Sequence, residues 1–277
     1  LKSFPFQRKA HALVIEKLIQ SGARHIAVDI LFDSLSSYGR SDDKELIDAL
    51  QRHRDKVTLA ALYEKSDSYQ GISWQLVLPH QQFRTGVSVG SVNFPLEVDS
   101  KVHRLANVFP KLLAQQEGMV PNAIPSFDQS VLIAANIKYP QPEGERIHFY
   151  GGAGTFKTYS FWNVFEPEFW ETNLQSGKVF KDKIVLIGST ARTHKGTDYH
   201  RVAVSEQWLY PEEMAGVEIH ANAIATLMEG KSIVSPLSTS LQRSLFVLFL
   251  VGGSTILITR VKQGTTRFAA SLVIAII

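Results

Sequence analysis

"FKDKIVLIGSTA", residues 180–191, carries the pattern from which the architecture of the chain can be inferred. Four apolar residues, Ile184 to Ile187, run directly into Gly188, where the chain must turn sharply. A short apolar strand of this kind is typical of a parallel sheet that is covered on both faces. A phosphate-binding loop is disfavoured, because residues 195–197 stand in the order Lys-Gly-Thr and no Gly-x-Gly-x-x-Gly is present. The stretch therefore predicts a scaffold strand rather than a nucleotide-binding turn.

Helical and strand patterns alternate along the rest of the chain. Apolar side chains recur at helical spacing from Ala12 to Ile19, and Ser21 and Gly22 end that helix. The same criteria predict strands at 25–32, 56–64 and 146–152, paired strands at 90–94 and 102–110, and helices at 41–53, 126–139 and 217–229. Short strand–helix–strand connections indicate an α/β fold, with a mixed, largely parallel sheet flanked by helices. Residues 64–90 have no firm period, so we expect a recognition loop there.

Composition limits the class of partner. The chain has 277 residues, no cysteine and a formal net charge of +3. Residues 241–277 contain four basic residues and no acidic one, so residues 1–240 carry a net charge of −1. A nearly neutral domain gives no support to a nucleic-acid partner, which would need a clustered basic face. The chain starts at Leu1 without a methionine, so we expect it to be part of a longer or processed polypeptide.

The C-terminal residues favour a membrane-bound protein. Residues 244–259 are uncharged and largely apolar, which predicts a transmembrane helix over 239–260, with a buried core helix as the alternative. A basic loop follows at 261–267, and residues 268–277 predict the start of a second transmembrane helix. The positive-inside rule places the loop in the cytoplasm and residues 1–238 outside it. The lipid bilayer is therefore an expected partner of the C-terminal helices.

Several of these segments in series resemble the second class of CHASE domains, the cyclase/histidine-kinase-associated sensory extracellular domains of bacterial receptors. The resemblance covers about residues 10–235. It rests on "AVDILF" with "DDKELIDAL", on the hairpin "GSVNFPLEVDSKVHRL", on "FKDKIVLIGSTA" with Asp198, and on "MAGVEIHANAIATLMEG". The hairpin departs from the family pattern at Ser100, where the family has glycine, and at His103 before Arg104.

This resemblance implies a function without catalysis or a cofactor. It predicts a sensory input domain on the periplasmic side of the bacterial inner membrane. Such a domain regulates an intracellular nucleotide cyclase, histidine kinase or protein kinase, acts as a homodimer, and responds to a small-molecule or physical signal that the sequence does not identify. We expect the connector "KSIVSPLSTSLQ", residues 231–242, to carry the signal onward.

Polar residues within or beside the predicted elements are the candidate ligand-binding residues. Asp29 interrupts an apolar strand, so it either contacts a ligand at the carboxyl edge of the sheet or caps a nearby helix, and Asp33 has the same two interpretations. Asp198, Glu218 and His220 are chemically suited to a metal but lack a metal-binding spacing, so a hydrogen-bonding role is favoured and no metal site is predicted. The remaining candidates, Asp99 and Arg104, lie in the predicted hairpin.

Two other functional classes stay open. A stand-alone, membrane-anchored envelope domain that binds a ligand would have the same fold. A hydrolase is the weaker alternative, because Ser189 follows Gly188 without a Gly-x-Ser-x-Gly elbow. An active site would bring perturbed side chains together in one cleft, whereas an input domain would have a dimer surface.

Overall fold

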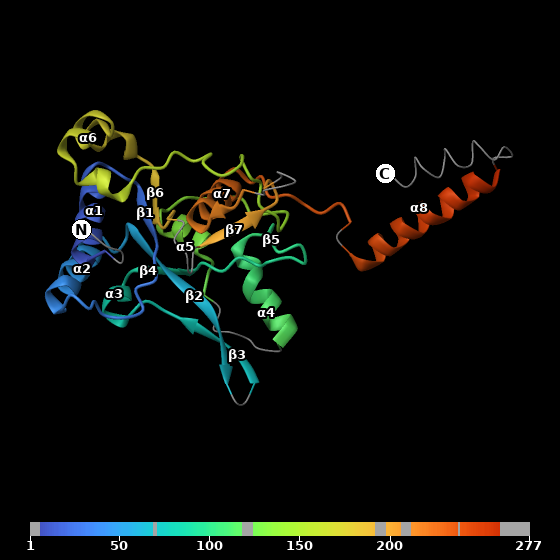
Figure 1. Cartoon of the computed structure of the whole chain (residues 1–277), viewed down its shortest axis with the longest axis horizontal. Helices are drawn as coiled ribbons and strands as arrows, with labels where there is room; N and C mark the ends of the chain where they lie inside the picture. Colours follow the sequence, from blue (N-terminus) through green and yellow to red (C-terminus); the bar gives the residue numbers. More distant parts are fainter. Residues whose placement is uncertain are drawn as a thin grey trace. The chain divides into compact units, whose positions relative to one another are not determined.

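The computed structural model describes residues 6–68, 71–117, 124–191, 198–205, 212–237 and 239–260 (Figure 1). The chain divides into two units, Leu1–Ile233 and Val234–Ile277. The first unit contains two β-sheets and their covering helices, and the described part of the second contains helix α8 (Ser240–Arg260).

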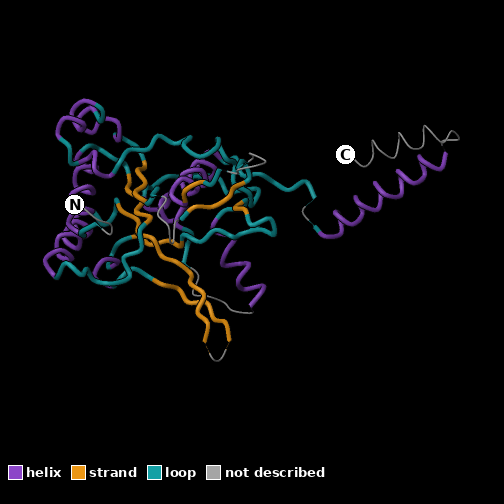
Figure 2. Tube along the Cα trace, in the orientation of Figure 1, coloured by secondary structure: helices purple, strands orange, loops and turns teal. Residues whose placement is uncertain are grey.

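A five-stranded sheet lies at the centre of the first unit. Its strands follow the order β3-β2-β1-β6, and β4 pairs with the inner part of β2. Strand β1 is parallel to β2 and β6, and β2 is parallel to β4 but antiparallel to β3. The paired strands β2 and β3 extend beyond the rest of the sheet (Figure 2). The bounds are β1 (His25–Asp29), β2 (Val57–Ser68), β3 (Gly71–Val77), β4 (Ser88–Ser91) and β6 (Ile184–Gly188).

A smaller sheet contains β5 (Lys101–Val102), β7 (Tyr199–Val202) and β8 (Met214–Ala215) in the order β5-β7-β8. Strand β7 is parallel to β5 and antiparallel to β8. The α/β class is confirmed, but the prediction of a largely parallel sheet is wrong, because both sheets are mixed. Only residues 69 and 70 separate β2 from β3, and so short a connection permits only an antiparallel pair.

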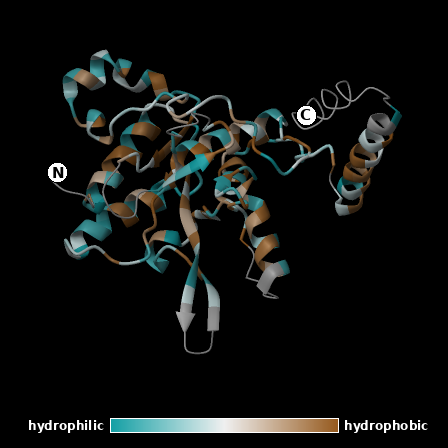
Figure 3. Ribbon diagram, turned by 45° about the vertical axis from the view of Figure 1, so that its right-hand side comes forward, coloured by the Kyte–Doolittle hydropathy of each residue, from teal (hydrophilic) through white to brown (hydrophobic). Residues whose placement is uncertain are grey.

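Helices cover both faces of the five-stranded sheet. Alternate residues of β1 belong to different clusters of the core: Ile26 and Val28 pack with α1 and α2, whereas Ala27 packs with α5 and α7. Figure 3 shows hydrophobic residues, in brown, on the strands and on the helices that cover them. The helices are α1 (Arg8–Gln20), α2 (Arg40–Arg52), α3 (Gln81–Arg84), α4 (Phe109–Glu117), α5 (Phe127–Ala134), α6 (Pro167–Thr172) and α7 (Gly216–Glu229), with 3₁₀ turns at Ala106–Val108, Phe161–Val164 and Gln175–Phe180.

The helices and strands that were predicted from a strongly periodic or continuous apolar pattern are confirmed: they are α1, α2, α5 and α7, and β1, β2 and β6. Three irregular segments were predicted wrongly. The expected loop at 64–90 contains the end of β2 and all of β3 and α3. The strands expected at 90–94 and 102–110 do not pair with each other, because β4 pairs with β2 and β5 pairs with β7; a single antiparallel bridge, between Leu96 and Val102, closes the turn between them. At 146–152 the backbone forms isolated bridges at Arg146 instead of a strand.

The helix expected near residues 239–260 is present as α8. Among the described residues, however, no helix is long and apolar enough to cross a membrane, so the predicted span is not supported. The apolar run Leu245–Val251 is followed by Gly252, Gly253 and Ser254, which lower the hydropathy of the helix. The predicted loop at 261–267 and the second span at 268–277 lie outside the described residues.

Gly90 gives a direct test of how closely α5 packs on the sheet. A Cβ atom added at Gly90 would lie 2.6 Å from the Cα atom of Phe127, a backbone atom that cannot rotate away. We expect Gly90→Ala to lower the free energy of unfolding by about 2 kcal/mol, measured by urea denaturation. The control is Gly152→Ala, where an added Cβ would meet nothing within 4 Å. Equal midpoints for the two variants would contradict the packing described.

Candidate functional site

The candidate site lies at the carboxyl edge of the five-stranded sheet. Asp29 ends β1 and is paired in register with Gly188, which ends β6. A Cβ atom added at Gly188 would lie 2.6 Å from the Cβ of Val217, so glycine permits the first turn of α7 to lie directly against the strand end. In open α/β sheets ligands bind beyond this edge, which makes the residues at the strand ends the candidate site.

A buried ion pair joins the two helices above this edge. The Nδ1 atom of His220, in α7, lies 2.6 Å from Oδ1 of Asp128, in α5. The two side chains are only 2% and 1% exposed. The rings of Phe94 and Phe127 flank His220, with centroids 4.5 and 5.0 Å from its own. The pair is therefore enclosed by aromatic side chains that exclude water.

The second carboxylate oxygen of Asp128 is also buried. Within the described part of the chain, Oδ2 has no hydrogen-bond partner. A buried carboxylate oxygen without a partner is unusual in a folded protein and often marks a functional site. Asp128 thus has one strong interaction, with His220, and one unused acceptor.

The charges at the sheet edge act on one another. Burial opposes the charge on His220, but the Asp128 carboxylate and its hydrogen bond, together with Asp29 and Asp198, raise the pKa of His220 to about 8. Burial raises the pKa of Asp29 to about 6; the nearby carboxylates of Asp198 and Asp128 add to this shift, and His220 and His200 oppose it. Asp29, Asp198 and His220, predicted separately from the sequence, therefore belong to one electrostatic cluster.

Asp198 connects this cluster to the start of α7. Its main-chain oxygen accepts a hydrogen bond from the N–H of Gly216 (2.8 Å), and a Cβ atom at Gly216 would overlap its carboxylate. A carboxylate in this position interacts favourably with the helix dipole. The hydrogen bond from His200 (Nε2 to Oδ1, 2.8 Å) lowers the pKa of Asp198, whose side chain is partly exposed.

Glu218 has a structural role at the same end of α7. Its carboxylate accepts hydrogen bonds from the N–H groups of Gly154 (2.8 and 3.0 Å) and Phe156 (3.4 Å). This contact holds the loop around Gly154 against the helix. The structure therefore gives Glu218 the hydrogen-bonding role that the sequence favoured over a metal-ligand role.

The other predicted site residues make their contacts elsewhere. Asp33 accepts a hydrogen bond from the neighbouring Ser34 hydroxyl (3.1 Å). Asp99 pairs with His103 (2.9 Å) on an exposed turn. Arg104 forms an ion pair with Glu97 (3.1 Å). None of these three residues contributes to the pKa shifts at the sheet edge.

The sequence analysis missed Asp128. An acidic residue two positions after the N-cap Ser126 looks like an ordinary first-turn carboxylate that complements the helix dipole. A signal was nevertheless present, because Val131 and Leu132 lie three and four positions further on and share its inward face. Helical periodicity alone therefore predicts burial of Asp128.

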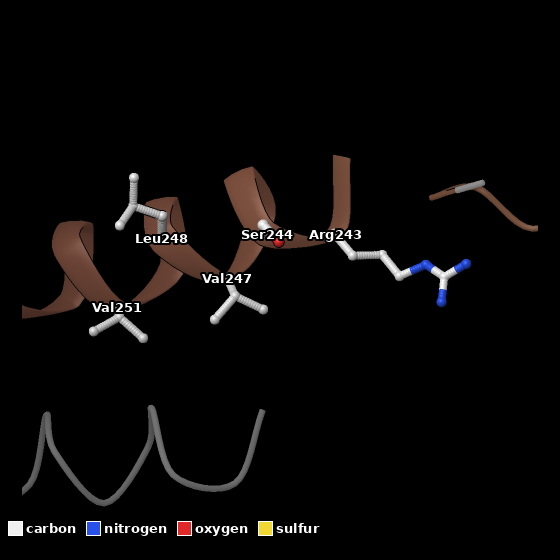
Figure 4. Close-up of a pocket in the computed structure, with 5 residues that line it drawn as sticks. All are labelled: Arg243, Ser244, Val247, Leu248 and Val251. Carbon is white, nitrogen blue, oxygen red and sulfur yellow. The ribbon is translucent and has the colours of Figure 1, made fainter. Parts of the chain in front are cut away.

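The cluster does not form a recognisable metal site. No group of three or more His, Cys, Asp or Glu side chains among the described residues is placed to hold a metal ion. A separate shallow hollow lies on α8, lined by apolar side chains and by Arg243 and Ser244 (Figure 4). It contains no convergent set of polar groups, so we do not assign a function to it.

Comparison with known proteins identifies one family. A family model described as the CHASE2 domain matches residues 1–258. No curated protein and no solved structure matches the chain significantly.

Removal of the carboxylate partner tests the buried pair. Asp128→Asn leaves His220 without its counter-charge, so we expect the free energy of unfolding at pH 7 to fall by about 3 kcal/mol in urea denaturation. The control is Asp99→Asn, which breaks the exposed pair with His103 and costs less than about 1 kcal/mol. A loss below about 1 kcal/mol for Asp128→Asn would contradict a charged His220.

The pKa of His220 also predicts how stability depends on pH. The folded protein binds this proton more tightly than the unfolded chain does, since the carboxylates around His220, Asp128 above all, outweigh the opposing effect of burial and raise its pKa from 6.5 to about 8. The stabilisation is fully present below pH 6.5 and is lost as the pH rises through 8. We expect a decrease of about 2 kcal/mol between pH 6.5 and 8.5 that is absent in His220→Gln. The same slope in both proteins would assign it to other groups.

Proposed function

The chain belongs to the CHASE2 family, and on this premise we propose that it is the extracytoplasmic sensory input domain of a bacterial membrane receptor. CHASE2 domains are extracellular sensory domains of receptors rather than catalytic domains. In our proposal the domain regulates an intracellular nucleotide cyclase, histidine kinase or protein kinase, and it acts as a homodimer in which a signal changes the packing between protomers. The match over residues 1–258 is the observation that carries this proposal.

The contacts of the last residues of the first unit support a role in transmitting the signal. Gly230 ends α7 in the left-handed conformation (φ 65°). Ile233 then exchanges two backbone hydrogen bonds with Arg146, at 3.0 and 3.4 Å. The Ser232 hydroxyl accepts a third hydrogen bond, from the N–H of Gly144 (3.0 Å). Movement of α7 would therefore act on a segment that is held until the last residue of the unit.

An ion-pair network supports this exit. The main chains of Arg104 and Arg146 form an isolated β-bridge. The carboxylate of Glu97 forms ion pairs with both arginine side chains, at 3.1 and 3.4 Å. Arg104, a predicted ligand-binding residue, thus neighbours the exit of the chain rather than the sheet edge. We infer that it helps to hold the exit segment in place.

The coding sequence that follows Ile277 tests the proposed function. We expect it to encode a nucleotide cyclase, histidine kinase or protein kinase domain within a few hundred codons. A continuation that encodes no such output domain would overturn the receptor assignment and would favour a stand-alone ligand-binding domain of the cell envelope.

The backbone bridge at the exit gives a functional prediction. Ile233→Pro removes the N–H that donates to Arg146, a hydrogen bond worth about 1 kcal/mol. In the complete receptor we expect this change to shift the basal output activity by about fivefold. The matched control is Val234→Pro, one residue later and outside the bridge. Equal activities of the two variants would show that the bridge does not transmit the signal.

A further inference from the structure

We propose that the buried pair of Asp128 and His220, together with the partly buried Asp29 at the end of β1, is a proton-binding site whose occupancy sets how α7 packs on α5 and on the sheet edge. The inference rests on the proposed sensory function and deepens it, because it makes the proton the ligand of the domain. Titration would then change the packing of the helix that leads directly to the exit segment.

The His220–Asp128 pair is isolated from water. Three other histidine–carboxylate pairs are present among the described residues, formed by His53, His103 and His200, and each has side chains that are partly exposed. Water screens these pairs, so their protonation has little effect on packing. The His220–Asp128 pair lies in the core between two helices, where the loss of one charge leaves the other uncompensated.

Carboxylates outnumber histidines around His220. Three carboxylates, those of Asp29, Asp128 and Asp198, act on the same histidine. The exposed His200 is already paired with Asp198. When both histidines are protonated, one negative charge remains uncompensated in the cluster. The Oδ2 atom of Asp128 is buried without a hydrogen-bond partner among the described residues, so His220 is the main compensation for this carboxylate.

The other charged groups on α7 are satisfied by separate partners. Glu218 is bound by the amides of the loop around Gly154. At the far end of the helix, Glu229 pairs with Lys231. The described strands β6 and β8, which also pack on α7, contribute no titratable side chain. The titratable groups that face the start of α7 are therefore Asp29, Asp128, Asp198, His200 and His220.

The direction of the response follows from these charges. At mildly acidic pH His220 is charged and Asp29 takes up a proton, since its pKa is raised to about 6, so α7 is held against α5. As the pH rises past about 8, His220 loses its proton, and the carboxylates of Asp29, Asp128 and Asp198 repel one another. Their repulsion is relieved when the first turns of α7 move outward and admit water.

Hydrogen exchange of the 277-residue chain at pH 6 and pH 8.5 tests the inference, with labelling times corrected for the intrinsic rate. We expect the protection of α7, relative to α1 as an internal reference, to fall about tenfold at the higher pH. Asp128→Asn should lower the protection of α7 already at pH 6 and remove the pH response. The control Asp99→Asn should respond like the unmodified chain.

His220→Lys provides a second variant in case Asp128→Asn does not fold. A lysine keeps its charge through pH 8.5, so α7 should remain protected at both pH values. The proposal is overturned if α7 in the unmodified chain responds no more than α1, or if His220→Lys responds as the unmodified chain does.

The output of the complete receptor separates this inference from the proposed function. If α7 responds to pH and the output activity follows the external pH, both are supported. If α7 responds but the output does not follow, the proton site stands, the proton is not the signal that the receptor transmits, and the proposed sensory function is decided by the coding sequence after Ile277. If α7 does not respond, the proton site fails, whatever the coding sequence after Ile277 encodes.

Discussion

A charge buried in a protein core must be compensated by an opposite charge. Between α5 and α7, the contact of His220 with Asp128 provides this compensation. The two residues are 92 positions apart in the chain, so the pair fixes the relative position of two helices that no local sequence signal connects. Phe94 and Phe127 enclose the pair and keep it dry. The same enclosure makes loss of either charge costly.

Small residues allow this layer to approach the sheet. Ala27 and Ala60 present little more than a methyl group to the α5–α7 side, whereas Ile26 and Val28 fill the opposite side. Gly188 permits α7 to begin directly against the end of β6. Small side chains thus allow α5 and α7 to pack close to the sheet, whereas larger apolar side chains fill the α1–α2 side.

The sequence predicted the elements whose side chains face a uniform environment. The runs at 184–187 and 26–28 are apolar because residues on both faces of their strands are buried or partly buried, and α1 and α7 follow helical spacing because one face is buried. The segment 64–90 was misjudged, because β3 is an edge strand with polar residues such as Ser73 and Gln75 and therefore lacks a continuous apolar pattern. The pairing of β5 with β7 joins segments about 100 residues apart, which local patterns do not encode.

Part of the candidate site could also be predicted. Asp29 and His220 interrupt apolar runs, and the cost of burying a polar group marked them as paired or functional. Their partner was missed, because an acidic residue in the first turn of a helix is common and needs no special explanation. Asp99 and Arg104 were selected from the family resemblance, and their roles depend on local ion pairs that only the three-dimensional arrangement reveals.

The most direct test of this account is the protonation state of the His220 ring at pH 7, measured by long-range proton–nitrogen correlation NMR and assigned with His220→Gln. The account predicts that both ring nitrogens carry a proton, since Asp128 stabilises the imidazolium in the core. A neutral ring with one unprotonated nitrogen would contradict it, and the contact between α5 and α7 would then be an ordinary hydrogen bond rather than a buried ion pair.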